Sequence, residues 1–152
     1  MKNKFMILGV GNSLRHDDGI GVAAIKLLQQ ENLSNVDLID GGVDGLGLID
    51  VIKKYPRALI IDAVDMKLVP GAVKLFSAHD AKIKIKNDAL STHGFGLAQT
   101  LGLLEKLGCK TEIKIIGIQP QDVSFGEGLT EVVAASIQEV IKLVRNACHP
   151  AA

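Results

Sequence analysis

Acidic and histidine side chains that could bind a metal ion lie at separated points of this chain. Asp17 and Asp18 come soon after a first apolar stretch, Asp40 and Asp62 directly follow two later ones, and His93 lies farther on. Carboxylate oxygens and imidazole nitrogens are ligands for divalent transition metals such as nickel, zinc and iron. The sequence therefore predicts an acidic pocket with one histidine, in which Asp18, Asp62 and His93 are the candidate metal ligands.

These residues also have simpler structural interpretations. Asp17 or Asp18 is predicted to cap the helix that follows, because an aspartate accepts hydrogen bonds from the free N–H groups of a first helical turn. An aspartate after a strand often bonds to backbone N–H groups of its own turn. A histidine near the start of a helix is usually a partly exposed surface residue, and this interpretation also suits His16, His79 and His149.

A glycine-rich turn before the two aspartates raises nucleotide binding as an alternative. A dinucleotide fingerprint needs a third glycine three residues after Gly11, where this chain has Leu14. A Walker A loop needs a lysine before the helix, where this chain has Asp17-Asp18-Gly19. Paired carboxylates at the start of a helix repel phosphate, so nucleotide binding is the less favoured alternative. A serine nucleophile is not indicated either, because the chain has no Gly-x-Ser-x-Gly elbow.

Strand-like and helix-like apolar patterns alternate along the chain. Short apolar runs predict strands over 4–10, 36–39, 58–61, 72–76 and 113–116. Apolar residues at helical spacing predict helices over 20–30, over 46–54, from a cap at Ser91 or Thr92 to 106, and from a cap at Thr130 to 146. This order predicts an α/β fold: a single three-layer sandwich with a twisted, mostly parallel sheet, one antiparallel edge strand and helices on both faces.

The predicted fold also predicts where the candidate residues meet. Residues 1–147 are expected to form one domain, with 148–152 as a tail, because no linker, repeat or low-complexity segment interrupts the alternation. Loops that leave the carboxyl ends of parallel strands meet at one edge of the sheet and form its binding site. The aspartates that follow the strands are therefore expected to lie close together, within reach of the loop that carries His93.

The composition excludes several partners. Among 152 residues, 17 lysines and arginines balance 17 aspartates and glutamates, and aromatic residues make up only 3%. The chain thus predicts neither a basic surface nor stacking platforms for nucleic acid. No apolar run is long enough to span a bilayer, and the two isolated cysteines indicate neither a disulfide framework nor a zinc site. We expect a cytoplasmic protein with no membrane partner.

Several separated stretches together resemble the hydrogenase maturation endopeptidases, the proteases that trim the large subunit of nickel-iron hydrogenases. The stretches are GVGNSL (9–14) with DDGIG (17–21), DGG (40–42), DAVD (62–65) with PG (70–71), STH (91–93), and GIQP (117–120) with GLT (128–130). Because they run through nearly the whole chain in the family's order, they are far more specific together than any one motif. One position departs from the family pattern: Lys67 stands where many members have a glycine.

The resemblance implies a fold, a reaction and a set of site residues. Family members have a twisted α/β sheet and remove a short C-terminal extension from a large-subunit precursor once its nickel-iron centre is assembled. The resemblance implies that Asp18, Asp62 and His93 contact nickel, which the substrate supplies, and it implies no organic cofactor. Asp40, Gly41 and Gly42 of the second motif are expected to shape the substrate cleft.

The same three metal-contacting residues are the candidate catalytic groups. Either Asp18 or Asp62 takes a proton from the attacking water, or the metal lowers the pKa of that water. Two hypotheses from other classes stay open: a non-catalytic chaperone that checks the nickel of the precursor without cutting it, and the nucleotide-binding protein considered above. For a protease of this size that docks on a protein substrate, we expect a monomer.

Overall fold

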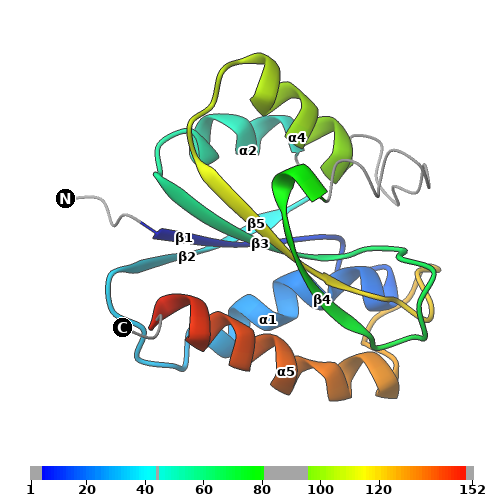
Figure 1. Cartoon of the computed structure of the whole chain (residues 1–152). Helices are drawn as coiled ribbons and strands as arrows, with labels where there is room; N and C mark the ends of the chain where they lie inside the picture. The colour runs from blue at the N-terminus through cyan, green and yellow to red at the C-terminus, as the bar shows by residue number, and fades with distance from the viewer. Residues whose placement is uncertain (1–4, 44, 81–95, 150–152) are drawn as a thin grey trace.

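A twisted five-stranded sheet forms the centre of the computed structural model, which describes residues 5–43, 45–80 and 96–149 (Figure 1). The strands lie in the order β2-β1-β3-β5-β4. β1, β2, β3 and β5 run parallel, and β4 pairs antiparallel with β5 at the edge. Their bounds are Phe5–Val10 (β1), Val36–Gly42 (β2), Arg57–Ala63 (β3), Val73–Ser77 (β4) and Glu112–Ile118 (β5). The predicted mixed sheet with one antiparallel edge strand is confirmed.

Helices cover both faces of the sheet and complete three layers (Figure 1). α1 (Ile20–Leu28) and α5 (Glu131–Cys148) pack on one face, and α2 (Gly45–Ile52) and α4 (Leu97–Lys106) pack on the other. A short 3-10 helix, η1 (His16–Gly19), directly precedes α1. None of the described helices is both long and apolar enough to cross a membrane. The domain limits 1–147 stay a prediction.

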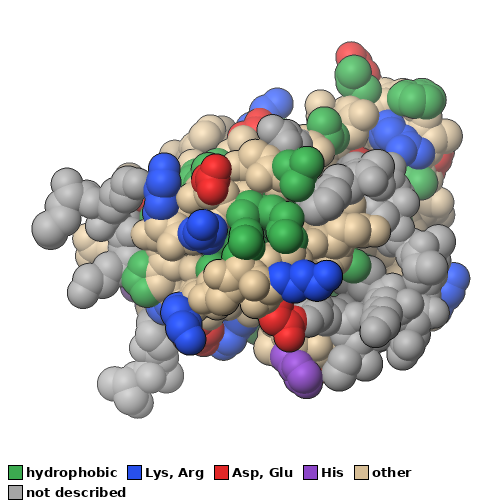
Figure 2. Space-filling model, turned by 90° about the horizontal axis from the view of Figure 1, so that it is seen from above, with side chains coloured by type: hydrophobic (Ala, Val, Ile, Leu, Met, Phe, Trp, Pro, Cys, Tyr) green, Lys and Arg blue, Asp and Glu red, His purple; other side chains and the backbone are tan. Residues whose placement is uncertain are grey.

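The continuous apolar strands follow from this double covering. Ile7, Leu59 and Ile61 point to the core shared with α1 and α5, whereas Leu8 and Ile60 belong to the core shared with α2 and α4. Successive side chains of a strand point to opposite faces, so a strand that is buried on both sides must be apolar at every position. Seen from the side of α2 and α4, the described surface carries interspersed basic, acidic and hydrophobic side chains (Figure 2).

Two element boundaries differ from the sequence prediction. α4 begins at Leu97, and its N-cap is Gly96, whose N–H donates to the Gln99 side chain at 3.1 Å. The predicted cap at Ser91 or Thr92 is therefore wrong, and these two residues themselves lie outside the described part of the chain. β2 continues to Gly42, beyond the apolar run, because its last residues still pair with β1 at Gly9 and Val10.

Close backbone packing joins α1 to the carboxyl ends of the central strands. A Cβ at Gly21 would lie 2.3 Å from the Ile61 carbonyl oxygen and 2.5 Å from that of Val10. A Cβ at Gly9 would in turn lie 2.2 Å from the Gly21 carbonyl oxygen. The first turn of α1 therefore rests directly on β1 and β3, and η1 comes with it.

We expect Gly21→Ala to destabilise the protein by about 2–3 kcal/mol, because the new methyl group meets backbone atoms that cannot turn away. Gly102→Ala is the matched control, since a Cβ at Gly102 in α4 would meet nothing within 4 Å. That variant is expected to gain about 0.5–1 kcal/mol from higher helix propensity. Chemical unfolding of both variants measures the difference, and equal stabilities would contradict the close packing at Gly21.

Candidate functional site

Two buried carboxylates lie at the carboxyl edge of the sheet. Asp62 is the second-last residue of β3, and Asp18 lies in η1, which follows the neighbouring strand β1. Their exposed fractions are 3% and 0%. The predicted convergence of these two residues from separate strands is what the fold produces, because parallel neighbours end at the same edge.

Asp62 has an unusual environment for a carboxylate. Its Oδ1 atom is buried and has no hydrogen-bond partner in the structure. Burial, and secondarily the charge of Asp18, raise the pKa of Asp62 well above its usual value, and a hydrogen bond from the Ala63 backbone opposes this only in part. A buried polar atom without a partner is costly. This oxygen is therefore available to a proton, a water molecule or a cation.

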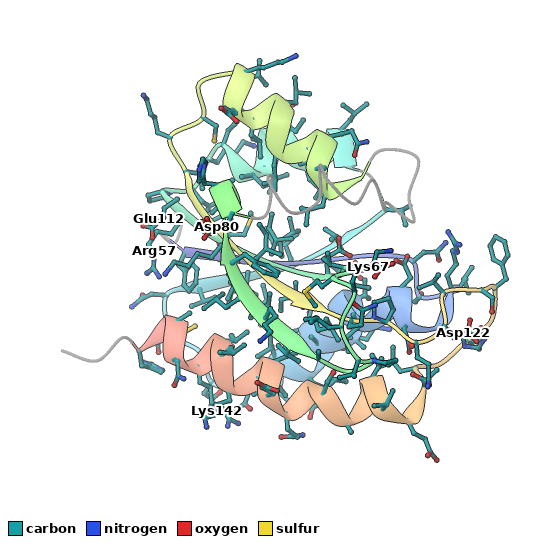
Figure 3. All side chains as sticks on the ribbon, turned by 45° about the vertical axis from the view of Figure 1, so that its right-hand side comes forward. Arg57, Lys67, Asp80, Glu112, Asp122 and Lys142 are labelled. Atoms are coloured by element: carbon teal, nitrogen blue, oxygen red, sulfur yellow. The ribbon has the colours of Figure 1, made fainter. Side chains whose placement is uncertain are left out.

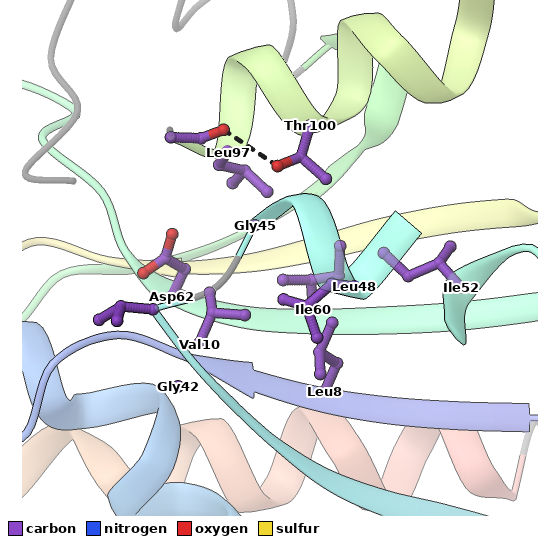
Figure 4. Close-up of a pocket in the computed structure, with 12 residues that line it drawn as sticks. Leu8, Val10, Gly42, Gly45, Leu48, Ile52, Ile60, Asp62, Leu97 and Thr100 are labelled. Carbon is purple, nitrogen blue, oxygen red and sulfur yellow. Dashed lines mark hydrogen bonds between the residues drawn. The ribbon is translucent and has the colours of Figure 1, made fainter. Parts of the chain in front are cut away.

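Asp62 faces a small pocket between the strand ends and the helices α2 and α4 (Figure 4). Its free volume of about 30 Å³ is enough for a water molecule or a metal ion. The walls are apolar apart from Asp62 and Thr100, whose hydroxyl donates to the Gly96 carbonyl oxygen at 3.1 Å. The remaining lining residues are Leu8, Val10, Gly42, Val43, Gly45, Leu48, Ile52, Ile60 and Leu97.

The loop between β1 and η1 positions Asp18. The Asn12 backbone N–H donates to Asp18 Oδ2 at 2.9 Å, and the Asn12 side chain accepts from the Leu14 N–H at 2.9 Å. Gly11 has a φ of 135°, and a Cβ there would lie 1.9 Å from the Asp18 carbonyl oxygen. Only glycine fits such a position. The predicted turn roles of Gly11 and Asn12 are confirmed.

Asp17 has a structural task that differs from that of its neighbour. It is completely buried and accepts hydrogen bonds from the backbone N–H groups of Gln121 and Asp122, at 2.8 and 3.0 Å. It also accepts from the N–H of Thr130 at 2.8 Å and from its hydroxyl at 2.8 and 3.0 Å. Asp17 thereby ties η1 to the loop between β5 and α5.

The predicted capping of α1 by Asp17 or Asp18 is wrong. The N-cap of α1 is Gly19, and no side chain bonds to the free N–H groups there. Thr130 is the N-cap of α5 as predicted, but its side chain makes no capping bond because it bonds to Asp17 instead. Tertiary partners therefore take the hydrogen bonds that local capping rules assign to the helix ends.

The second motif forms the end of β2 beside the pocket. Gly42 lines the pocket with a φ of 54°, and its carbonyl oxygen accepts from the Gly11 N–H at 2.8 Å. A Cβ at Gly41 would lie 2.8 Å from Leu8 Cδ1, so this glycine lets the chain approach β1 closely. Asp40 is exposed, and its side chain accepts from the Gly42 N–H at 3.0 Å. Gly42 therefore borders the pocket, whereas Asp40 holds the turn.

The loop after β3 is held by a buried glutamine. Gln119 Oε1 accepts from the N–H groups of Met66, at 2.6 Å, and Leu68, at 3.3 Å, and its amide donates to Asp65 at 3.2 Å. A hydrogen bond from the Lys67 N–H is the main cause that lowers the pKa of Asp65. Lys67 has a φ of 59°, the left-handed region that favours glycine. The residue that departs from the family pattern thus occupies a glycine-like position.

Part of the predicted metal site lies beyond what the structure describes. His93 lies outside residues 5–43, 45–80 and 96–149, and among those residues no three His, Cys, Asp or Glu side chains form a group that could hold a metal ion. His16 is only partly exposed, with its Nδ1 2.9 Å from the Gly128 carbonyl oxygen. The structure therefore brings together Asp18 and Asp62.

Sequence analysis did not assign roles to Asp17, Gln119 and Thr130. All three belong to motifs quoted from the sequence, DDGIG, GIQP and GLT. Their motif membership was a signal, but their task was not, because each bonds to residues more than 50 positions away.

A larger cavity of about 310 Å³ lies at the opposite edge of the sheet, between the strand starts and the end of α5. Arg57 borders it and stacks on Phe5, with 4.3 Å from the guanidinium carbon to the ring centre. Arg57 and Glu112 lie at one end of the molecule, and Lys67 and Asp122, from the loops beside the candidate site, lie at the other (Figure 3). This cavity contains neither of the buried aspartates of the candidate site.

Comparisons with known proteins agree with this geometry. A family model described as hydrogenase maturation protease matches residues 22–147. The chain belongs to the hydrogenase maturation protease family. The recognised family, the α/β fold and the class of hydrogenase maturation endopeptidase are thereby confirmed.

Individual relatives give the same result. The chain is 33% identical over 144 residues to the hydrogenase expression/formation protein HupD of Thiocapsa roseopersicina, matching 92% of this chain but only 65% of that longer protein. It is 31% identical to a putative hydrogenase maturation protease of Methanocaldococcus jannaschii, matching 94% and 95% of the two chains. Among solved structures, the hydrogenase maturating endopeptidase HybD from E. coli superposes with a TM-score of 0.84 at 29% identity, covering 97% of this chain and 91% of that one.

We expect Asp62→Asn to change the pH dependence of stability. A carboxyl whose pKa is raised on folding binds its proton more tightly in the native state, so stability falls as pH rises from about 4, the unfolded pKa, through the raised folded pKa. Asparagine removes this loss. In metal-free buffer the variant should gain stability over the wild type as pH rises across that window, then keep a constant advantage. Unfolding curves measured at several pH values test this, and a difference that is independent of pH would contradict it.

We expect Asp17→Ala to destabilise the protein by about 3 kcal/mol, because it leaves several buried N–H groups and a hydroxyl without an acceptor. Asp50→Ala, at an exposed position of α2, is the control and should change stability by less than about 0.5 kcal/mol. Chemical unfolding of both variants provides the measurement. Asp17→Ala as stable as the control would show that Asp17 does not hold the loop.

Proposed function

We propose that this protein removes the C-terminal extension from the large-subunit precursor of a nickel-iron hydrogenase after nickel has been inserted. The observation that supports this most directly is the buried Asp62 oxygen without a hydrogen-bond partner, facing a pocket beside a second buried carboxylate, Asp18. A divalent cation satisfies such an oxygen and offsets the repulsion between the two carboxylates.

The donor set fits nickel. Asp18 and Asp62 supply carboxylate oxygens, and His93, taken from the family resemblance, supplies an imidazole nitrogen. Nickel accepts both ligand types. In this proposal the nickel belongs to the substrate and reaches the pocket only when a loaded precursor docks.

Nickel then acts as a recognition signal. Without a cation, burial and the charge of Asp18 favour the protonated form of Asp62. A docked cation stabilises the ionised form, so the proton leaves as the substrate binds. The metal-free precursor offers no such gain, which explains why it would be left uncut.

The hydrolytic step requires a group that takes a proton from the attacking water. Asp62 suits this role because its raised pKa makes it a stronger base than an ordinary aspartate once ionised. Asp18 is the other candidate base, and the bound metal ion would supply further acidity to a water molecule. Gly42 leaves room beside the pocket for a substrate main chain, because it has no side chain.

A chaperone that checks nickel without cutting the precursor is the second candidate function. The same two carboxylates support it, because they account for metal recognition without requiring hydrolysis. Nucleotide binding has less support, since two buried carboxylates lie in the turn before α1, where phosphate requires positive charge or free N–H groups. Action as a monomer in the cytoplasm is part of the proposal and stays a prediction.

The deciding experiment mixes the purified protein with its hydrogenase large-subunit precursor in nickel-loaded and nickel-free forms, followed by intact-mass measurement. We expect loss of a C-terminal peptide from the loaded form alone. Asp62→Asn should slow this cleavage by at least about 100-fold, because both a metal ligand and a base are lost. Asp50→Asn, which changes an exposed carboxylate of α2, should cleave at the wild-type rate.

Three outcomes separate the hypotheses. Nickel-dependent binding of an uncut precursor would favour the chaperone. Cleavage of both precursor forms at equal rates would contradict nickel recognition. Full activity of Asp62→Asn would remove this residue from the site.

A further inference from the structure

Exposed hydrophobic residues gather at the carboxyl edge of the sheet, around the candidate site. Phe125 and Val69 are the most exposed of the large hydrophobic side chains described, at 82% and 75%. Most of the others that share this exposure follow the ends of β1, β2 and β3, and one of them, Val43, lines the pocket itself. The six exposed hydrophobic residues of this edge, here called the apolar rim, are Leu14, Val43, Leu46, Leu68, Val69 and Phe125.

Phe125 is held in place although it is exposed. The Arg15 guanidinium carbon lies 5.4 Å from the centre of the Phe125 ring, and Arg15 Nε donates to the Val123 carbonyl oxygen at 3.0 Å. On the other side of the ring's residue, the Gly126 N–H donates to the Leu14 carbonyl oxygen at 2.8 Å. The loop tip and the segment around Leu14 therefore form one braced unit with two exposed hydrophobic side chains.

Close packing and backbone bonds also join this unit to η1. The His16 N–H donates to the Gly126 carbonyl oxygen at 2.9 Å. Gly126 has a φ of 151°, and a Cβ there would lie 2.1 Å from His16 Nε2. Such a contact tolerates only glycine, so the loop tip and η1 have a fixed spacing.

The base of the same loop is fixed to the residue beside Asp18. Asp17 accepts hydrogen bonds from the loop at Gln121, Asp122 and Thr130. The loop is therefore clamped to η1 at both its tip and its base. Whatever contacts Phe125 is placed at a defined position relative to the buried carboxylates.

We propose that Phe125 and Leu14 form a docking contact for an apolar surface segment of the protein substrate. This inference rests on the proposed function, in which a folded precursor must bring its nickel and its peptide bond to the same edge. A small molecule would need only the pocket, whereas a rim of hydrophobic residues around it suits a protein surface. Aromatic side chains at the centre of such contacts commonly carry much of the binding energy.

The test compares Phe125→Ser with Leu107→Ser, which changes a hydrophobic residue 53% exposed just beyond the end of α4, away from the rim. Affinity for the nickel-loaded and the nickel-free precursor is measured by calorimetry, and cleavage kinetics are measured on the loaded form. For Phe125→Ser we expect at least about a tenfold weaker affinity and a correspondingly higher KM, which corresponds to about 1.4 kcal/mol. Its kcat and thermal midpoint should match those of the wild type.

Phe125→Leu serves as the conservative variant and should restore most of the affinity, because the contact is apolar rather than specific to an aromatic ring. Phe125→Ser that binds both precursor forms as tightly as Leu107→Ser does would overturn the inference, as would a wild-type protein that binds neither form. If the wild type binds the loaded precursor without cutting it, the proposed protease function fails. A loss of affinity in Phe125→Ser would still support the docking contact in that case.

Discussion

The burial of two like-charged carboxylates at one edge of a parallel sheet is the constraint on which this structure depends. Asp18 and Asp62 are held out of water by separate strands, and the charge of one raises the pKa of the other. Such a pair is unfavourable in an isolated protein. It persists because close backbone packing around Gly9, Gly11 and Gly21 fixes η1 against the strand ends and leaves the carboxylates no route to solvent.

Adjacent aspartates divide two tasks between them. Asp17 is saturated with hydrogen-bond donors from the loop before α5, so its charge is used for structure. Asp18 accepts from the Asn12 backbone and lies near Asp62, so its charge acts on the site. A substitution at either residue would reduce activity, but only loss of Asp17 releases the loop. Stability measurements therefore distinguish their roles where activity measurements do not.

The sequence predicted the fold well because strand and helix patterns are local. The apolar runs at 58–61 and 113–116 identified central strands, and the pattern at 72–76 identified the edge strand β4. Site geometry was predicted only as far as topology carries it, to the meeting of Asp18 and Asp62. The tasks of Asp17 and Gln119 depend on partners far away in the chain, which no local rule supplies. His93 keeps its predicted role as a hypothesis.

The proposed use of nickel follows from what the protein leaves unsatisfied. An enzyme whose own side chains satisfied every buried oxygen of the site would bind loaded and unloaded precursors alike. Asp62 Oδ1 has no partner from the protein, so a cation carried by the substrate adds an interaction that nothing else on the chain supplies. The free energy of that interaction distinguishes the two precursors, and a clamped apolar rim adds affinity that is the same for both. Selectivity then comes from the carboxylates, whereas general affinity for the precursor comes from the surface around them.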